Sequence, residues 1–215
     1  MVRQAFQAAG LGPVKALMGD QATESGLRRA VPGVKVVHLA THGYVRERIN
    51  ASLRLPPREE FRLGPGLERH VQSLDPMLLA GLALSGANTR VHEGDDDGIL
   101  TALEATELDL ESVDLVVLSA CDTARGIERA GDGVFGLVRG FSVAGARRVL
   151  ASRWPVAAEA TSALMERFYA RYLPGEGSAA EALRGANRDL REGAAGPQAS
   201  APRQWAAFVV HGPLR

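Results

Sequence analysis

Two apolar runs, each leading into a chemically reactive side chain, constrain the fold of this chain most strongly. Residues 34–40 and 113–119 are rich in valine and leucine and almost continuously apolar. Such runs are typical of strands that are buried on both faces of a sheet. The first run leads into His42 and the second into Cys121. Because reactive residues gather beyond the carboxyl ends of such strands, these two side chains are candidates for one site.

Helix-like segments alternate with strand-like runs along much of the remaining sequence. Apolar residues recur at helical spacing in residues 134–141 and 158–173. This alternation predicts an α/β layered fold with a mostly parallel sheet. Further strands are expected at residues 78–84, 149–152 and 205–210, mixed helical character at 2–17, and a long surface excursion at 44–76.

Helix starts are marked by short polar signals. Thr23 has the position of an N-cap before a short helix. Thr101 and Glu104 have the spacing of a capping box, as do Ser178 and Glu181. Each signal predicts where a helix begins.

The composition excludes several classes of partner. The chain has 25 basic and 25 acidic residues, so neither nucleic acid nor an anionic membrane surface is expected as a partner. Its longest apolar runs are too short to span a bilayer, and its N-terminus lacks the apolar stretch of a secretory signal. With 1 cysteine it forms no intramolecular disulfide, which favours a reducing cytoplasm. The length predicts a single domain over residues 1–215.

A thiol and an imidazole in one groove suit nucleophilic catalysis. A free thiol with a pKa of about 8.5 is mostly protonated at neutral pH. The imidazole of His42 can stabilise the Cys121 thiolate and then protonate the leaving amine. The backbone N–H groups of Gly43 and Cys121 can form an oxyanion hole, because glycine has no Cβ to block a close approach. Alternatively, Cys121 is a small buried residue and His42 a loop residue, and spacing alone leaves both readings open.

Other patterns indicate no metal or cofactor. Gly131, Gly133 and Gly136 match a dinucleotide fingerprint, but roughly ten residues separate them from the preceding strand, which that motif does not allow. His38 and His42 have the spacing of a zinc pair on a helix, yet they lie on and after a strand. His38 is expected to be a packed core residue. The aspartates at 95–97 are expected to form a solvated turn.

Two residues near the candidate dyad have open roles. Asp122 either presents its carboxylate to a basic substrate side chain or caps the turn that follows the cysteine. Trp154 either lines the substrate groove or is a core aromatic residue before Pro155. Both are candidate substrate-binding residues.

Several segments, in order along the chain, resemble one known family. His-Leu-Ala-Thr-His-Gly at 38–43 and Leu-Ser-Ala-Cys-Asp-Thr at 118–123 resemble the histidine and cysteine motifs of CHAT domains, which are relatives of caspases and separases. The resemblance implies a caspase-like fold, with a mostly parallel central sheet flanked by helices. It also implies a cysteine endopeptidase acting through His42 and Cys121, with a protein or peptide substrate. The resemblance continues through residues 97–102, 131–137, 144–146, 151–156 and 205–208.

The chain also departs from the family pattern in two ways. CHAT domains usually have a strand before the first helix seen here, so the domain is expected to be N-terminally truncated and to lack that strand. They are also commonly fused to tetratricopeptide repeats, which implies a regulatory protein partner or a repeat region. These departures motivate an alternative function, that of a catalytically silent caspase-like interaction module.

Overall fold

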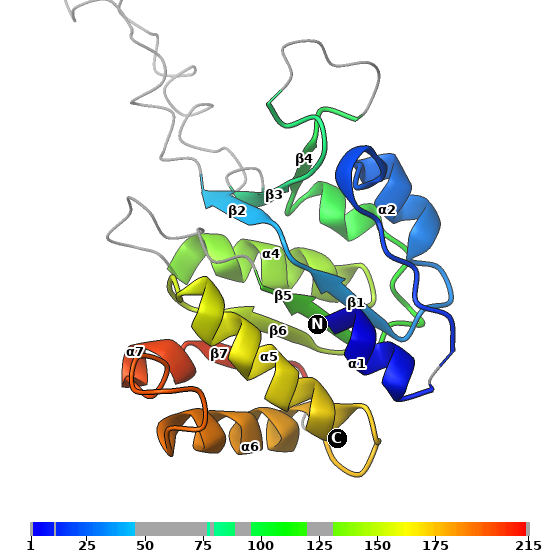
Figure 1. The fold of residues 1–215 in the computed structure, drawn as a ribbon. Helices are drawn as coiled ribbons and strands as arrows, with labels where there is room; N and C mark the ends of the chain where they lie inside the picture. Colours follow the sequence, from blue (N-terminus) through cyan, green and yellow to red (C-terminus); the bar gives the residue numbers. More distant parts are fainter. Residues whose placement is uncertain are drawn as a thin grey trace, which may run out of the picture.

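The computed structural model describes residues 2–10, 12–45, 77, 80–88, 96–119 and 131–213. At its centre is a mostly parallel sheet of four strands, as the sequence predicts (Figure 1). Strands β1, β5 and β6 are parallel, and β7 is antiparallel to β6. The order across the sheet is β1 (Val36–Leu39), β5 (Leu115–Leu118), β6 (Val149–Ser152) and β7 (Phe208–His211).

The two central strands are buried on both faces, which explains their continuous apolar sequence. Every residue of β5 and β6 is buried. In β5, Leu115 and Val117 belong to one apolar cluster, whereas Val116 and Leu118 belong to another. Because alternate side chains of a strand point to opposite faces, the sheet separates two hydrophobic layers.

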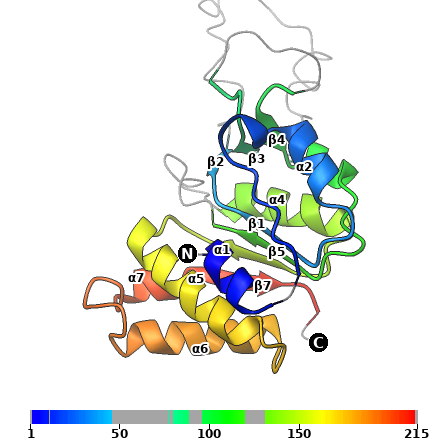
Figure 2. The ribbon, with the colours of Figure 1, turned by 45° about the vertical axis from the view of Figure 1, so that its right-hand side comes forward.

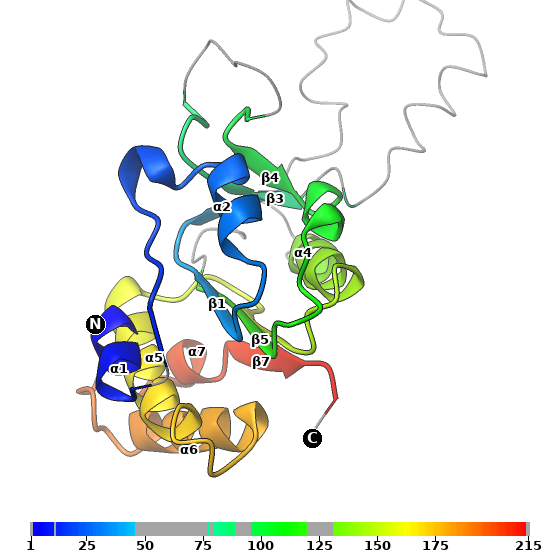
Figure 3. The ribbon, with the colours of Figure 1, turned by 90° about the vertical axis from the view of Figure 1, so that its right-hand side faces the viewer.

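One face of the sheet is covered by helices from both ends of the chain. These are α1 (Val2–Ala8), α5 (Ala158–Tyr172), α6 (Ala179–Arg191) and α7 (Pro202–Trp205). Helix α1 packs on α5, where the rings of Phe6 and Tyr169 meet edge to face at 5.0 Å. Figure 3 shows α1, α5 and α6 together on this side of the sheet.

The opposite face is covered by α2 (Glu24–Ala30), the 3₁₀ turn η4 (Glu104–Glu107) and α4 (Gly131–Val143). Leu27 and Phe141 are buried in its apolar cluster. The 3₁₀ turn η1 (Gly19–Gln21), which precedes α2, has no buried residue. The chain therefore forms helix, sheet and helix layers.

A second, antiparallel sheet of three strands lies beside the first, on the same side of the molecule as α2 (Figure 2). Its order is β2 (His42–Val45), β3 (Ala80–Ala83) and β4 (Ile99–Thr101). Leu82 and Leu100 are fully buried and join the cluster under α4. Most of the excursion expected at 44–76 lies outside the described residues, and its first two residues belong to β2.

Three expected helix signals are present. The Thr23 hydroxyl accepts from the Gly26 N–H at 3.0 Å at the start of α2. Ser178 and Glu181 form the reciprocal capping box of α6. Thr101 and Glu104 exchange the same kind of hydrogen bonds, although the 3₁₀ turn begins only at Glu104.

Two boundaries differ from the expectation. Helix α1 ends at Ala8 rather than continuing to residue 17, because Gly10 and Gly12 take the positive φ angles 65° and 105° that end a helix. Trp205 closes the short helix α7 instead of opening the last strand, which begins at Phe208. Proline at the first position of α7 favours that helical turn.

Candidate active site

The two strands expected to deliver the reactive side chains are neighbours. Strands β1 and β5 pair in parallel, with Leu39 opposite Leu118. The ladder extends one residue further, where the Ser119 N–H donates to the Leu39 carbonyl at 3.1 Å. The carboxyl ends of both strands therefore lie at the same edge of the sheet, where α/β proteins bind ligands.

His42 lies where the chain passes from the four-stranded to the three-stranded sheet. Strand β1 ends at Leu39, and after two residues His42 opens β2 opposite Ala83. The Thr41 hydroxyl donates to the Ala83 carbonyl and so fixes this crossing. The His42 side chain is exposed, as access to a substrate requires.

The other candidate residues fall partly inside the described chain. Gly43 is buried and pairs with Leu82 across β2 and β3. Cys121 and Asp122 lie outside the described residues. The structure therefore places the histidine and its glycine but gives no distance to the thiol.

Trp154 is held at the same edge of the sheet. It follows β6, which runs parallel to β5, so it lies beyond the same carboxyl ends as His42. The half-buried indole donates from Nε1 to the Arg203 carbonyl of α7 at 2.7 Å. The Arg153 guanidinium lies 5.8 Å from the centre of its ring. Trp154 is thus a half-buried residue that packs against the edge of an apolar cluster and is fixed by its hydrogen bond to α7.

A part-buried chain of hydrogen bonds supports the end of β5. His38 Nδ1 lies 2.7 Å from the Tyr169 hydroxyl, and His38 Nε2 lies 2.9 Å from Ser119 Oγ. The Ser119 hydroxyl also lies within hydrogen-bond distance of the Leu39 carbonyl, at 3.4 Å. The imidazole tautomer with its hydrogen on Nε2 suits this arrangement, because Ser119 can then accept from Nε2 and donate to Leu39 while Nδ1 accepts from Tyr169.

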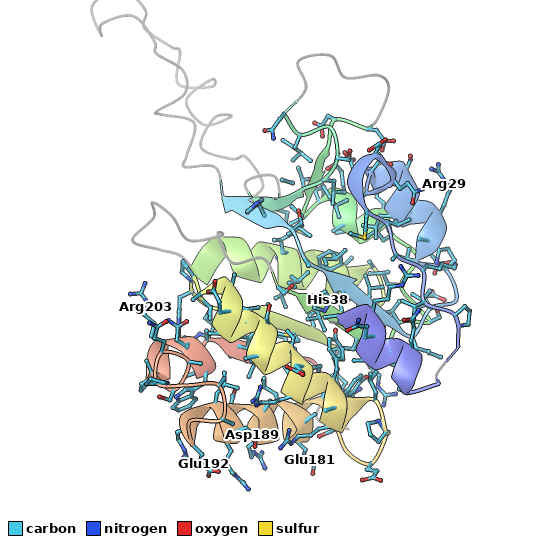
Figure 4. All side chains as sticks on the ribbon, viewed as in Figure 1. Arg29, His38, Glu181, Asp189, Glu192 and Arg203 are labelled. Carbon is cyan, nitrogen blue, oxygen red and sulfur yellow. The ribbon has the colours of Figure 1, made fainter. Side chains whose placement is uncertain are left out.

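Burial keeps His38 neutral. Burial lowers the pKa of His38 to about 4 and raises the pKa of the fully buried Tyr169 above its ordinary value. Figure 4 shows His38 between β1 and α5. Sequence reasoning places His38 in the core but does not identify its partners, which are 81 and 131 residues away.

A buried carboxyl holds the three-stranded sheet against α2. Glu24 is 1% exposed, and its Oε1 accepts from the N–H groups of Gly98 and Ile99 at 2.9 and 3.1 Å. Burial, then the charges of Glu104 and Asp97, raise the pKa of Glu24 to about 7. The sequence gives no sign of this contact, since a glutamate in a first helical turn is ordinarily solvated.

The described residues form neither a metal-binding cluster nor a membrane-spanning helix. Within the ranges placed by the structure, no three His, Cys, Asp or Glu side chains meet in a way that could hold a metal ion. In the same ranges, no helix has both the length and the apolar character needed to cross a membrane.

Comparison with known proteins identifies the family. The chain is 30% identical over 214 residues to mouse (Mus musculus) tetratricopeptide repeat protein 28, which covers 97% of this chain and 8% of that protein. It is 28% identical over 225 residues to the human (Homo sapiens) protein of the same name, with the same coverage of 97% and 8%. The chain thus spans only a small part of these relatives. Since the CHAT domain family matches residues 1–213, this chain belongs to that caspase-like family.

Proposed function

We propose that the chain is a cysteine endopeptidase in which Cys121 is the nucleophile and His42 its base. The register of β1 and β5 carries this proposal. Leu39 and Leu118 are paired, and His42 and Cys121 each follow their member of that pair by three residues. Only two residues lead from Ser119 to Cys121, and two residues span at most about 7 Å. Covalent reach therefore supports a thiol near the edge of the sheet where His42 lies.

The proposed reaction follows from the two side chains. His42 takes the proton of Cys121, and the resulting thiolate attacks the carbonyl carbon of a peptide bond. The C–N bond then breaks as His42 protonates the leaving amine, which leaves a thioester. Water, deprotonated by His42, hydrolyses the thioester and restores the thiol. In both steps the N–H groups of Gly43 and Cys121 stabilise the oxyanion.

Asp122 and Trp154 complete the proposed substrate groove. The fixed position of Trp154 beyond β6 supports a role as one wall of the groove. Asp122, next to the nucleophile in sequence, presents a carboxylate to a basic substrate side chain, as acidic pockets do in other peptidases.

We also propose a cytoplasmic location and a regulatory protein partner for this activity. A reducing cytoplasm keeps a single catalytic cysteine in its thiol form. The two relatives are named for tetratricopeptide repeats, which supports a repeat region or another protein as the regulatory partner of the domain.

A second function, that of a catalytically silent interaction module, rests on the same relatives. Their name refers to repeats and not to a peptidase. In this alternative the caspase-like fold binds a partner, and Cys121 has the reactivity of an ordinary thiol.

Cleavage of a diverse peptide mixture, analysed by mass spectrometry, tests the peptidase proposal. The wild-type chain is expected to produce cuts that are absent with Cys121→Ala and with His42→Ala, because each variant lacks one partner of the dyad. Circular dichroism checks that both variants fold. Cuts that persist in either folded variant would contradict the proposed roles.

A further inference from the structure

Residues of α6 and α7 line a groove. Both helices lie on the face of the sheet that carries α5 (Figure 1). Its volume is about 430 Å³. Most of its wall is one stripe of α6, because residues three and four apart line the same side of a helix. The lining residues are Ala180, Leu183, Arg184, Asn187, Arg188 and Arg191 of α6 and Trp205 of α7.

The floor of this α6–α7 groove is apolar. Leu183 is buried, and Ala180 and Trp205 are half-buried. The indole Nε1 of Trp205 already donates to the Ser200 carbonyl at 3.0 Å, so the polar atom of this side chain is satisfied within the protein. What Trp205 adds to the groove is therefore apolar surface, which suits an apolar side chain of an occupant.

The rim of the groove is positively charged and largely unpaired. Arg184 and Arg188 are exposed, and neither has an ion-pair partner among the described residues. Arg191 makes only a 3.8 Å contact with Glu192. By contrast, Arg171 of α5 pairs with Asp189 of α6 at 2.7 Å. The guanidinium groups at the rim are thus available to carboxylates from outside.

Acidic groups of α6 do not neutralise this rim. Glu181 is engaged with Ser178 in the capping box, and Asp189 is engaged with Arg171. Figure 4 labels both, together with Glu192, along α6, and shows a further arginine, Arg203, on α7. The surface around the groove therefore favours a negatively charged occupant.

Asn187 adds a polar side chain to the wall of the groove. The residue is half-buried, but its Oδ1 is itself buried, so this oxygen is not exposed to an occupant. The choice of occupant therefore rests on the apolar floor and the charged rim. A peptide segment can supply an apolar side chain and carboxylates together, which favours a polypeptide.

We propose that the α6–α7 groove binds a segment of a partner protein in which one apolar side chain is flanked by carboxylates. The apolar side chain occupies the floor, and the carboxylates pair with Arg184 and Arg188. This surface is separate from the residues assigned to peptide cleavage, so the proposal does not depend on peptidase activity.

Fluorescence anisotropy with labelled 12-residue peptides tests this proposal on the 215-residue chain. The probes carry glutamates around one central residue, which is Leu, Ile, Val, Met, Phe or Trp in turn. A matched set has glutamine in place of every glutamate. We expect the acidic set to bind at least about tenfold more tightly than the glutamine set, and to weaken as salt is added.

Variants distinguish the contribution of the charged rim to peptide binding from that of the apolar floor. Arg184→Glu with Arg188→Glu is expected to weaken binding about tenfold or more. Ala180→Phe fills the groove without changing its charge and is expected to have a comparable effect. The matched control is Arg139→Glu, an exposed arginine of α4 on the opposite face, with a change below about twofold. Thermal unfolding confirms that each variant folds.

Several results would overturn the proposal. These are failure of every acidic peptide to bind at about 1 mM, equal binding of the glutamine set, and equal loss with Arg139→Glu. Binding of a 12-nucleotide thymidine strand more tightly than the best peptide, with the same dependence on Arg184 and Arg188, would assign the groove to nucleic acid instead.

Discussion

The two sheets of the molecule are stabilised by different kinds of interaction. The four-stranded sheet lies between two apolar layers, and Leu115, Val116 and Leu150 in it have no exposed surface. One of its titratable residues, the half-buried His38, is neutral and hydrogen-bonded at both nitrogens. The three-stranded sheet is instead joined to α2 by the carboxyl of Glu24, whose Oε2 is buried without a partner among the described residues.

This difference gives the two sheets opposite responses to pH. The folded pKa of His38 is about 4 against 6.5 for a free imidazole, so its contribution to stability is present above pH 6.5 and is lost as the pH falls through about 4. The folded pKa of Glu24 is about 7 against 4.5 for a free glutamate, so its contribution to stability is present below pH 4.5 and is lost as the pH rises through about 7.

The proposed dyad takes one residue from each sheet. His42 opens a strand of the three-stranded sheet, whereas Cys121 follows a strand of the four-stranded sheet in sequence.

The largest expected effect concerns the apolar layer of the four-stranded sheet. Phe168 of α5 is fully buried and packs against Tyr169 and Tyr172. Phe168→Ala is expected to lower the free energy of unfolding by about 3–5 kcal/mol, because it leaves a cavity. Urea denaturation measures this loss. The control Val143→Ala, at a side chain 63% exposed, is expected to change it by less than about 0.5 kcal/mol. Similar losses in both variants would contradict the assignment of this layer.

The second largest expected effect is the pH dependence of stability that Glu24 gives to the three-stranded sheet. Glu24→Gln keeps an oxygen that accepts from Gly98 and Ile99 but does not titrate. Between pH 4.5 and about pH 8, the wild-type free energy of unfolding is expected to fall by about 2–3 kcal/mol relative to the variant. The cause is that burial and the charges of Glu104 and Asp97 oppose ionisation of Glu24. Urea denaturation of both proteins across this range gives the difference, and a constant difference would refute the buried, protonated carboxyl.

A smaller effect tests the hydrogen bonds around His38. Tyr169→Phe removes the hydroxyl that donates to His38 Nδ1 and nothing else. The variant is expected to lose about 1–2 kcal/mol of stability, because a buried acceptor is left unsatisfied. NMR titration of the imidazole should also show a higher pKa for His38, since Nδ1 is then open to a proton. An unchanged pKa with unchanged stability would show that the hydroxyl does not support the imidazole.

Local signals in the sequence predict much of the first sheet. Strand β6 and helix α5 follow directly from a short apolar run and a helical stripe, and the capping box of Ser178 and Glu181 places the start of α6. The predicted site requires β1 and β5 to be neighbours, and the structure shows that they are. These features depend on neighbours in the sequence or on a general rule for parallel sheets.

Features that depend on distant contacts are not predictable in this way. Glu24 lies 74 residues from Gly98, whose positive φ of 78° and closeness to the Ala87 backbone leave no room for a side chain. His38 and Tyr169 are 131 residues apart. Pairing of β2 with β3 similarly requires the chain to return from a long excursion. Periodicity contains no information on which distant groups meet.

The pH dependence of alkylation tests most directly whether His42 activates Cys121. The chain has 1 cysteine, so iodoacetamide labelling reports on that thiol alone. If the two residues form a dyad, the wild-type rate should rise with an apparent pKa below about 7, and His42→Ala should return it to about 8.5. Superimposable profiles, both with the pKa of a free thiol, would contradict the dyad and favour the interaction module.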